Sequence, residues 1–114
     1  MKIVIPEIPP SLNRYAGRKN VHEYRREKDR WRDMVAWLAM VKGKARFEFA
    51  TVRITYFFPD SRRRDPDNYA GKMILDGLTA AGVIADDDFF HIKLEIRGAV
   101  DRKNPRTEVE VIPC

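Results

Sequence analysis

Hydrophobic and polar positions along this chain follow the period of β-strands in four segments. In these segments apolar residues alternate with polar ones, or β-branched and aromatic residues dominate. The four segments are residues 1–5, 47–58, 90–96 and 107–112. Turn-like residues at 101–105 separate the last two, which predicts a β-hairpin. Three prolines after the first segment predict an irregular loop.

Two other segments repeat their apolar residues every three or four positions, as amphipathic helices do. The first is Val21–Lys42, where Asn20 can cap the start and Gly43 can end the helix. The second covers residues 66–81, with Asp65 as its predicted N-cap and a proline at its first position. The element order β-α-β-α-β-β predicts an α+β fold with a single layer of mixed sheet and two helices.

Length and composition narrow the class of protein. A chain of 114 residues with 44% hydrophobic residues predicts a single globular domain spanning residues 1–114. Because Cys114 is the only cysteine, no disulfide can form within the chain, and a reducing cytoplasm is the expected compartment. No apolar run reaches the length needed to cross a membrane, and the first residues lack the features of a signal peptide.

Positive charge is concentrated in the first part of the chain. Residues 1–46 contain 12 Lys and Arg against 5 Asp and Glu, whereas residues 47–114 contain 10 against 12. An enzyme acting on phosphodiesters could attract its polyanionic substrate with one surface and hold cations with the other. An ordinary basic protein with a solvated charged surface fits the charge balance equally well.

The segment Arg62–Asn68, with the sequence RRRDPDN, is the most informative part of the chain. Its carboxylates, Asp65 and Asp67, repel each other unless a cation lies beside them, and Mg²⁺ is commonly held by one or two carboxylates together with substrate phosphate. The arginines match the geometry of phosphate. A second acid group, Asp86–Asp88, follows the second predicted helix. Structural roles are the alternative, because acids also cap helices and form polar turns.

Two longer strings then carry a resemblance to a known family. Arg63–Asn68 (RRDPDN) and Leu75–Asp87 (LDGLTAAGVIADD) closely resemble the RusA family of Holliday junction resolvases, which prophages often carry. Pro9–Asn13 (PPSLN) resembles the early loop of that family. The resemblance implies a RusA-like fold and a Mg²⁺-dependent, structure-specific DNA endonuclease, with Mn²⁺ as a substitute ion. It also implies a homodimer that resolves four-way junctions by paired symmetric nicks during recombination and repair, in the cytoplasm of a bacterium and encoded by the bacterium or a phage.

The resemblance also assigns roles to individual residues. It implies that the metal ligands are the carboxylates on both sides of the second helix: Asp65, Asp67, Asp86 and Asp87. The catalytic residues that it implies are Asp65, Asp67, Asp87 and Lys72. Lys72 stands one residue further from Asp67 than the family spacing, and one residue turns a side chain by about 100° around a helix. Asp88 is an extra acid, so the choice among the three consecutive aspartates stays open.

Contacts with the DNA backbone are expected from residues of the motif and of the first loop. These residues are Asn13, Arg14, Arg18, Lys19, Arg62, Arg63 and Arg64, which would hold phosphates rather than read bases. The aromatic ring of Tyr15 is a candidate wedge at the branch point. The alternative function is a non-catalytic nucleic-acid-binding module whose acids only cap a helix and shape a turn. Asp67→Asn separates the two, because only a nuclease would lose its activity.

Overall fold

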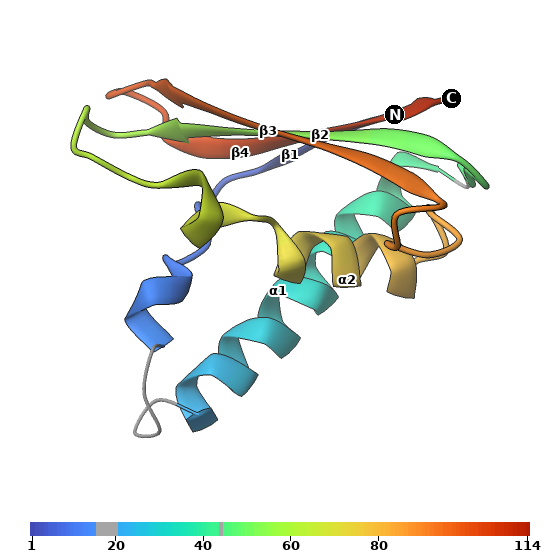
Figure 1. Ribbon diagram of the computed structural model, residues 1–114, viewed down its shortest axis with the longest axis horizontal. Coiled ribbons are helices and arrows are strands. Elements are labelled where there is room, and N and C mark those ends of the chain that lie inside the picture. The colour runs from blue at the N-terminus through green and yellow to red at the C-terminus, as the bar shows by residue number, and fades with distance from the viewer. Residues whose placement is uncertain (16–20, 44) are drawn as a thin grey trace.

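The structure, a computed structural model, describes residues 1–15, 21–43 and 45–114. Its strands form one mixed sheet, and two α-helices lie together on one face of that sheet (Figure 1). In chain order the elements are β1 (Lys2–Ile5), the 3₁₀ helix η1 (Leu12–Tyr15), α1 (Val21–Lys42), β2 (Ala50–Phe58), the 3₁₀ helix η3 (Pro66–Tyr69), α2 (Lys72–Ala80), β3 (Ile92–Val100) and β4 (Arg106–Pro113). The predicted α+β fold and element order are confirmed.

The strand order in the sheet is β1-β4-β2-β3. β2 lies antiparallel to β4 and parallel to β3, and the parallel pair is joined through α2. The predicted hairpin of the last two strands is therefore wrong, because β4 lies between β1 and β2. The alternation of apolar residues shows which side of a strand is buried, but it does not select the neighbouring strand.

The core lies between the sheet and the two helices. From the sheet it takes the inward-facing residues Ile3, Ile5, Val52, Ile54, Tyr56, Val109 and Val111, and from the helices Trp31, Val35, Ile74 and Leu78. The helices approach closely at Gly77 of α2, where a Cβ atom would lie 2.6 Å from the Cβ of Val35. Among the described residues, no helix has the length and apolar character needed to span a membrane.

The second predicted helix is interrupted at Gly71. Residues 66–69 form the 3₁₀ helix η3, Gly71 has φ of 85°, and α2 begins only at Lys72. The left-handed conformation carries little steric cost for glycine alone. Space is short as well, because a Cβ atom at Gly71 would lie 2.5 Å from the Cδ1 of Ile54 in β2. This contact with a distant strand fixes the break that the local sequence pattern did not predict.

Other boundaries also differ in part from the predicted ones. α1 has the predicted bounds, whereas its predicted cap, Asn20, lies outside the described residues. β2 begins at Ala50 because Phe47 forms only an isolated bridge with Ile84. β3 covers residues 92–100 in place of 90–96, since the residues before it are held in a turn.

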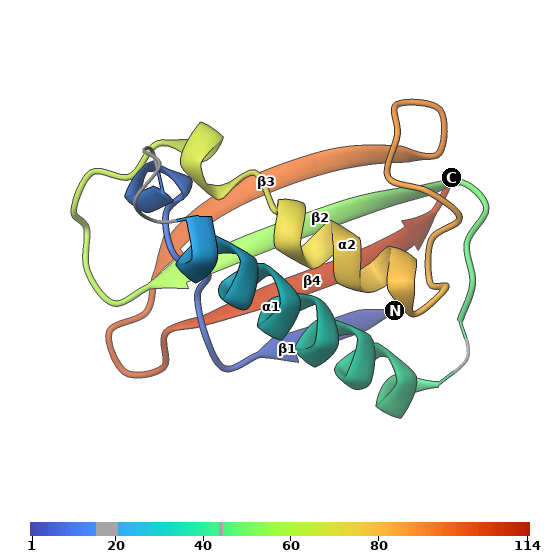
Figure 2. The same ribbon diagram turned by 90° about the horizontal axis from the view of Figure 1, so that it is seen from below.

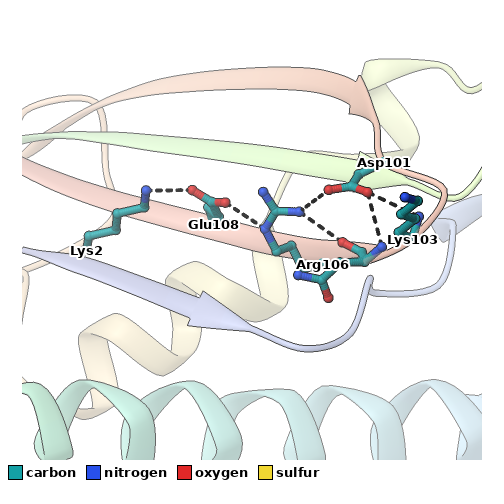
Figure 3. A network of polar contacts seen from close by, with 6 residues as sticks. Lys2, Asp101, Lys103, Arg106 and Glu108 are labelled. Atoms are coloured by element: carbon teal, nitrogen blue, oxygen red, sulfur yellow. Dashed lines mark hydrogen bonds and ion pairs between the residues drawn. The ribbon is translucent and has the colours of Figure 1, made fainter.

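The second face of the sheet carries paired charges and is covered by no described helix (Figure 1). Glu108 lies 2.7 Å from both Lys2 and Arg106, and Arg106 also donates to Asp101 at 2.8 Å (Figure 3). The same pattern recurs across β2, where the paired residues are Arg53, Glu95 and Glu110. Exposed pairs of this kind stabilise a fold little. Their mutual neutralisation leaves this face a poor surface for a polyanion.

Candidate active site

The first acid group lies in the segment between β2 and α2, and Arg64 fixes that segment to the sheet. The guanidinium of Arg64 lies 4.4 Å from the ring centroid of Phe58 and 2.9 Å from the carboxylate of Asp60. It also donates to the backbone carbonyl of Asp60 at 3.1 Å. Backbone and side-chain hydrogen bonds from Arg62 and Arg64 lower the pKa of Asp60. Arg64 is only 16% exposed, so its visible role is to position the loop.

Arg62 and Arg63 differ from Arg64 because they project into solvent. Their side chains are 80% and 89% exposed, and each has a carboxylate of the same loop within 3.4 Å. Exposed ion pairs of this kind are weak and are readily exchanged for phosphate. The three predicted DNA contacts of the motif therefore divide into two solvent-exposed cations and one cation that holds the loop.

The first loop lies beside the motif. An open hollow of about 410 Å³ is lined by Ser11 and Asn13 from the first loop and by the RRRD segment with Asn68 and Tyr69. Arg14 lies 2.8 Å from Glu23 of α1. The other two predicted contacts, Arg18 and Lys19, lie outside the described residues.

Asp65 and Asp67 lie exposed at the start of η3. Asp65 occupies the N-cap position of η3 as predicted, but its side chain makes no capping hydrogen bond. It accepts instead from Nε of Arg63 at 3.2 Å. The helix α2, which the sequence had joined to this segment, has Gly71 as its N-cap. The capping role that competes with metal binding is therefore not exerted by this carboxylate.

Lys72, the first residue of α2, extends toward the second acid group. Its Nζ lies 2.9 Å from Oδ1 of Asp76 and 3.5 Å from Oδ2 of Asp87. The hydrogen bond to Asp76, followed by the negative charges of both carboxylates, raises the pKa of Lys72, so the amine stays protonated. The extra residue before Lys72 does not turn it away from the site, because Gly71 interrupts the helix and an extrapolation by 100° per residue does not apply.

The three consecutive aspartates have different partners. Asp88 accepts hydrogen bonds at 3.0 Å from the backbone N–H groups of Phe90 and His91, and its Oδ1 lies 2.5 Å from Nδ1 of His91. Asp86 accepts from the backbone N–H of Asp87 at 2.7 Å. Asp88 thus shapes the turn before β3, whereas Asp87 has its carboxylate beside Lys72.

The carboxylates are oxygen donors of the kind that Mg²⁺ prefers, but the predicted ligands are not clustered. Among the described residues, one group of three places metal-ligating atoms within 4.8 Å of one another, and it consists of Asp86, Asp88 and His91. Asp65 and Asp67 lie before α2 and the other acids after it. The predicted ligands therefore fall into two groups, one before α2 and one after it.

Comparison with known proteins shows the family of this chain. A family model described as "Endodeoxyribonuclease RusA" matches residues 7–112, which include both acid groups and Lys72. The chain belongs to the RusA family. It is also 37% identical over 100 residues to the crossover junction endodeoxyribonuclease rusA of Enterobacteria phage HK97, and the match covers 85% of this chain and 82% of that protein.

Membership of the RusA family confirms the predicted enzyme class, an endodeoxyribonuclease that hydrolyses phosphodiester bonds. The sequence resembles a family that prophages often carry, and this relative is encoded by a phage. The family is one of junction-resolving endonucleases.

Four residues near the site have surroundings that the sequence did not indicate. Asp76 holds Lys72, and its spacing of four residues along α2 was the available signal. Phe89 and Phe90 are exposed beside the acid group, although the predicted strand began at Phe90. Tyr15, the predicted wedge, instead packs edge-on against Tyr24 with ring centroids 5.2 Å apart.

Proposed function

We propose that this protein is a divalent-metal-dependent Holliday junction resolvase, which introduces paired symmetric nicks into branched DNA as a homodimer. The contact of Lys72 with Asp87 carries this proposal. It joins the lysine and the acid of the second group, although they stand 15 residues apart in the sequence. A structural cap or a polar turn needs no such partner, whereas a phosphoryl-transfer site needs both a cation and a carboxylate.

The proposed metal ligands are Asp65, Asp67, Asp86 and Asp87. All four lie outside the α-helices and strands and are at least partly exposed, and carboxylate oxygens fit a hard divalent cation such as Mg²⁺ or Mn²⁺. A bound divalent cation supplies an activated water and neutralises charge on the phosphate. Asp88 is a poor candidate for the same role because its carboxylate is engaged in the turn.

Lys72 is proposed to stabilise the negative charge that develops on the phosphate. Its ammonium group is held in place by Asp76 from within α2 and remains charged. A fixed cation costs no reorganisation when the charge develops, which is why such groups are effective in catalysis. Lys72 also orients Asp87, so one side chain serves both the substrate and a ligand.

The DNA backbone is proposed to lie across the hollow beside η3. Arg62, Arg63 and Asn13 border this hollow, and Arg14 lies on the same loop as Asn13. These residues would hold phosphates without reading sequence, so affinity for branched DNA should fall steeply with salt. A homodimer matches the two-fold symmetry of a four-way junction, because two identical sites can then nick two strands.

A cleavage assay on a synthetic mobile four-way junction tests this function. Wild-type protein should cut the junction with Mg²⁺ or Mn²⁺ and leave it intact with EDTA. Asp67→Asn should bind the junction but lose at least about 100-fold in rate, the scale of a lost charged catalytic group. Asp33→Asn, which removes an exposed acid of α1, is the matched control and should cut normally.

Two results would contradict the proposed function. Wild-type protein that leaves junctions intact with either ion is no resolvase. An Asp67→Asn variant that retains full activity would favour the alternative, a nucleic-acid-binding module with structural acids. The light-scattering mass of the protein tests the homodimer separately from cleavage.

A further inference from the structure

Two phenylalanines project from the turn that follows the second acid group. Phe89 is 100% exposed and Phe90 is 85% exposed, although burying a phenyl ring is among the strongest contributions to folding. The segment between α2 and β3, which carries both residues, extends past the β3 edge of the sheet (Figure 2). Two adjacent large apolar side chains that the fold leaves uncovered point to a surface for a ligand.

The turn that presents these rings is rigidly built. Asp88 accepts from the backbone N–H groups of Phe90 and His91, and its hydrogen bond with the His91 ring raises the pKa of His91. The backbone N–H groups of His91 and Ile92 also donate to the carbonyl of Asp88, both at 3.2 Å. The backbone that carries the two rings is therefore fixed before any ligand arrives.

An open hollow of about 630 Å³ lies beside Phe89. Its walls are apolar, from Leu75 of α2 and from Ile92 and Leu94 of β3. Its rim carries two anions and one cation next to the proposed active site: Asp87, Asp88 and Lys93. Flat apolar walls with a few polar groups at the rim are the surroundings that a nucleobase requires, since its faces are apolar and its edges and phosphate are polar.

We propose that this hollow receives an unstacked base of the branched DNA, and that Phe89 stacks on this base. The inference rests on the proposed function, because it assumes that Asp87 works at the scissile phosphate. Phe89 follows Asp87 by two residues, and two residues of chain span at most about 7 Å. Stacked bases are spaced by about 3.4 Å along a strand. With the lengths of the two side chains added, Phe89 reaches a base within a few nucleotides of the bond that is cut.

A DNA base is a better occupant than a second copy of the chain. A subunit seated in this hollow would cover Asp87 and Lys93, and the contact of Asp87 with Lys72 would be closed to substrate. Stacking on a phenyl ring also needs no particular base, which suits an enzyme that recognises the shape of a junction. The base next to an exchange point is the easiest one to supply, because its stacking is already interrupted.

The test uses a four-way junction with 2-aminopurine beside the exchange point, because the fluorescence of this base reports its stacking. All proteins carry Asp67→Asn, so that the DNA stays uncut. Phe89→Ala should bind the junction about tenfold more weakly, the loss of one base–aromatic contact, and should abolish the fluorescence change on binding. Phe89→Tyr should behave as the parent. Trp37→Ala, which removes a 64% exposed aromatic ring of α1, is the matched control and should leave binding and fluorescence unchanged.

Two results would overturn the inference. One is a Phe89→Ala variant with the affinity and fluorescence change of its parent. The other is a halved light-scattering mass for Phe89→Ala, which would assign the ring to a subunit interface. Cleavage of the junction by protein with Asp67 intact is measured in parallel. If this protein cuts junctions while Phe89→Ala changes nothing, the proposed function stands and only the stacking inference fails. Parent protein that fails to bind junctions would contradict both this inference and the proposed function.

Discussion

Gly77 is the closest point between the two helices, and Gly77→Ala should destabilise the fold. The added Cβ atom would lie 2.6 Å from Cβ and 2.8 Å from Cγ1 of Val35, and 3.0 Å from the backbone carbonyl oxygen of Arg32. Two of these three atoms cannot move away without shifting α1, so the cost of overpacking falls near its upper range of about 3 kcal/mol. Alanine gains about 1 kcal/mol in helix propensity. The net loss should be about 2 kcal/mol.

Urea unfolding followed by circular dichroism measures this loss. The midpoint should fall while the slope of the free energy of unfolding with urea stays constant, because the surface exposed on unfolding changes little. Ala36→Gly at a partly exposed position of α1 is the control, since it reports the propensity difference between alanine and glycine in a helix. A Gly77→Ala variant that is more stable than the parent by about 1 kcal/mol would refute the reasoning, because propensity alone would then account for it.

The same substitution has a consequence for activity. α2 lies between the two acid groups and carries Lys72 at its first position. A shift of α2 away from α1 changes the 3.5 Å contact of Lys72 with Asp87. Gly77→Ala should therefore lower the rate of junction cleavage more than it lowers junction binding, measured well below the unfolding temperature.

Two further predictions concern charged groups around the site. The hydrogen bond to Asp88 raises the pKa of His91 from 6.5 and lowers that of Asp88 from 3.8, so the pair contributes most stability between these values. That stability is lost as pH rises through the raised pKa of His91 or falls through the lowered pKa of Asp88. NMR titration should show a midpoint for His91 above 6.5 that returns to the ordinary value in Asp88→Asn, and an unchanged midpoint would contradict the turn geometry. Arg63→Ala should reduce the slope of log affinity against log salt by about 1 without changing stability. Arg64→Ala should instead lower the unfolding temperature, and the opposite assignment of the two effects would contradict the loop structure.

Local pattern was sufficient for the elements whose boundaries depend on local contacts. α1 begins and ends where its periodicity and Gly43 predicted. The break at Gly71 was not predictable in the same way, because it depends on contact with Ile54 of a distant strand. The neighbour of β4 is likewise chosen by long-range pairing, which alternation along a strand does not encode. The element order and the bounds of α1 followed from the sequence, whereas the strand pairing and the break before α2 did not.

The residues of the candidate site were predictable from the sequence, but their individual roles were not. The acids and Lys72 could be named from spacing and resemblance, since a motif records which residue types occur together. Their individual duties depend on partners that the motif does not contain. Lys72 distinguishes Asp87 from its neighbours, and the turn hydrogen bonds distinguish Asp88. The stacking of Arg64 on the sheet separates it from the two arginines before it.

The paired charges on the second face of the sheet also affect how the protein meets DNA. The pairs there contain four cations (Lys2, Arg53, Arg97 and Arg106) and four carboxylates, whereas the whole chain has a net charge of +5. The excess positive charge therefore lies elsewhere on the molecule, which gives the protein an electric dipole. A polyanion rotates such a dipole during diffusion, before any contact forms. Productive encounters should thus outnumber those expected for random orientation, and salt should slow association by removing this rotation.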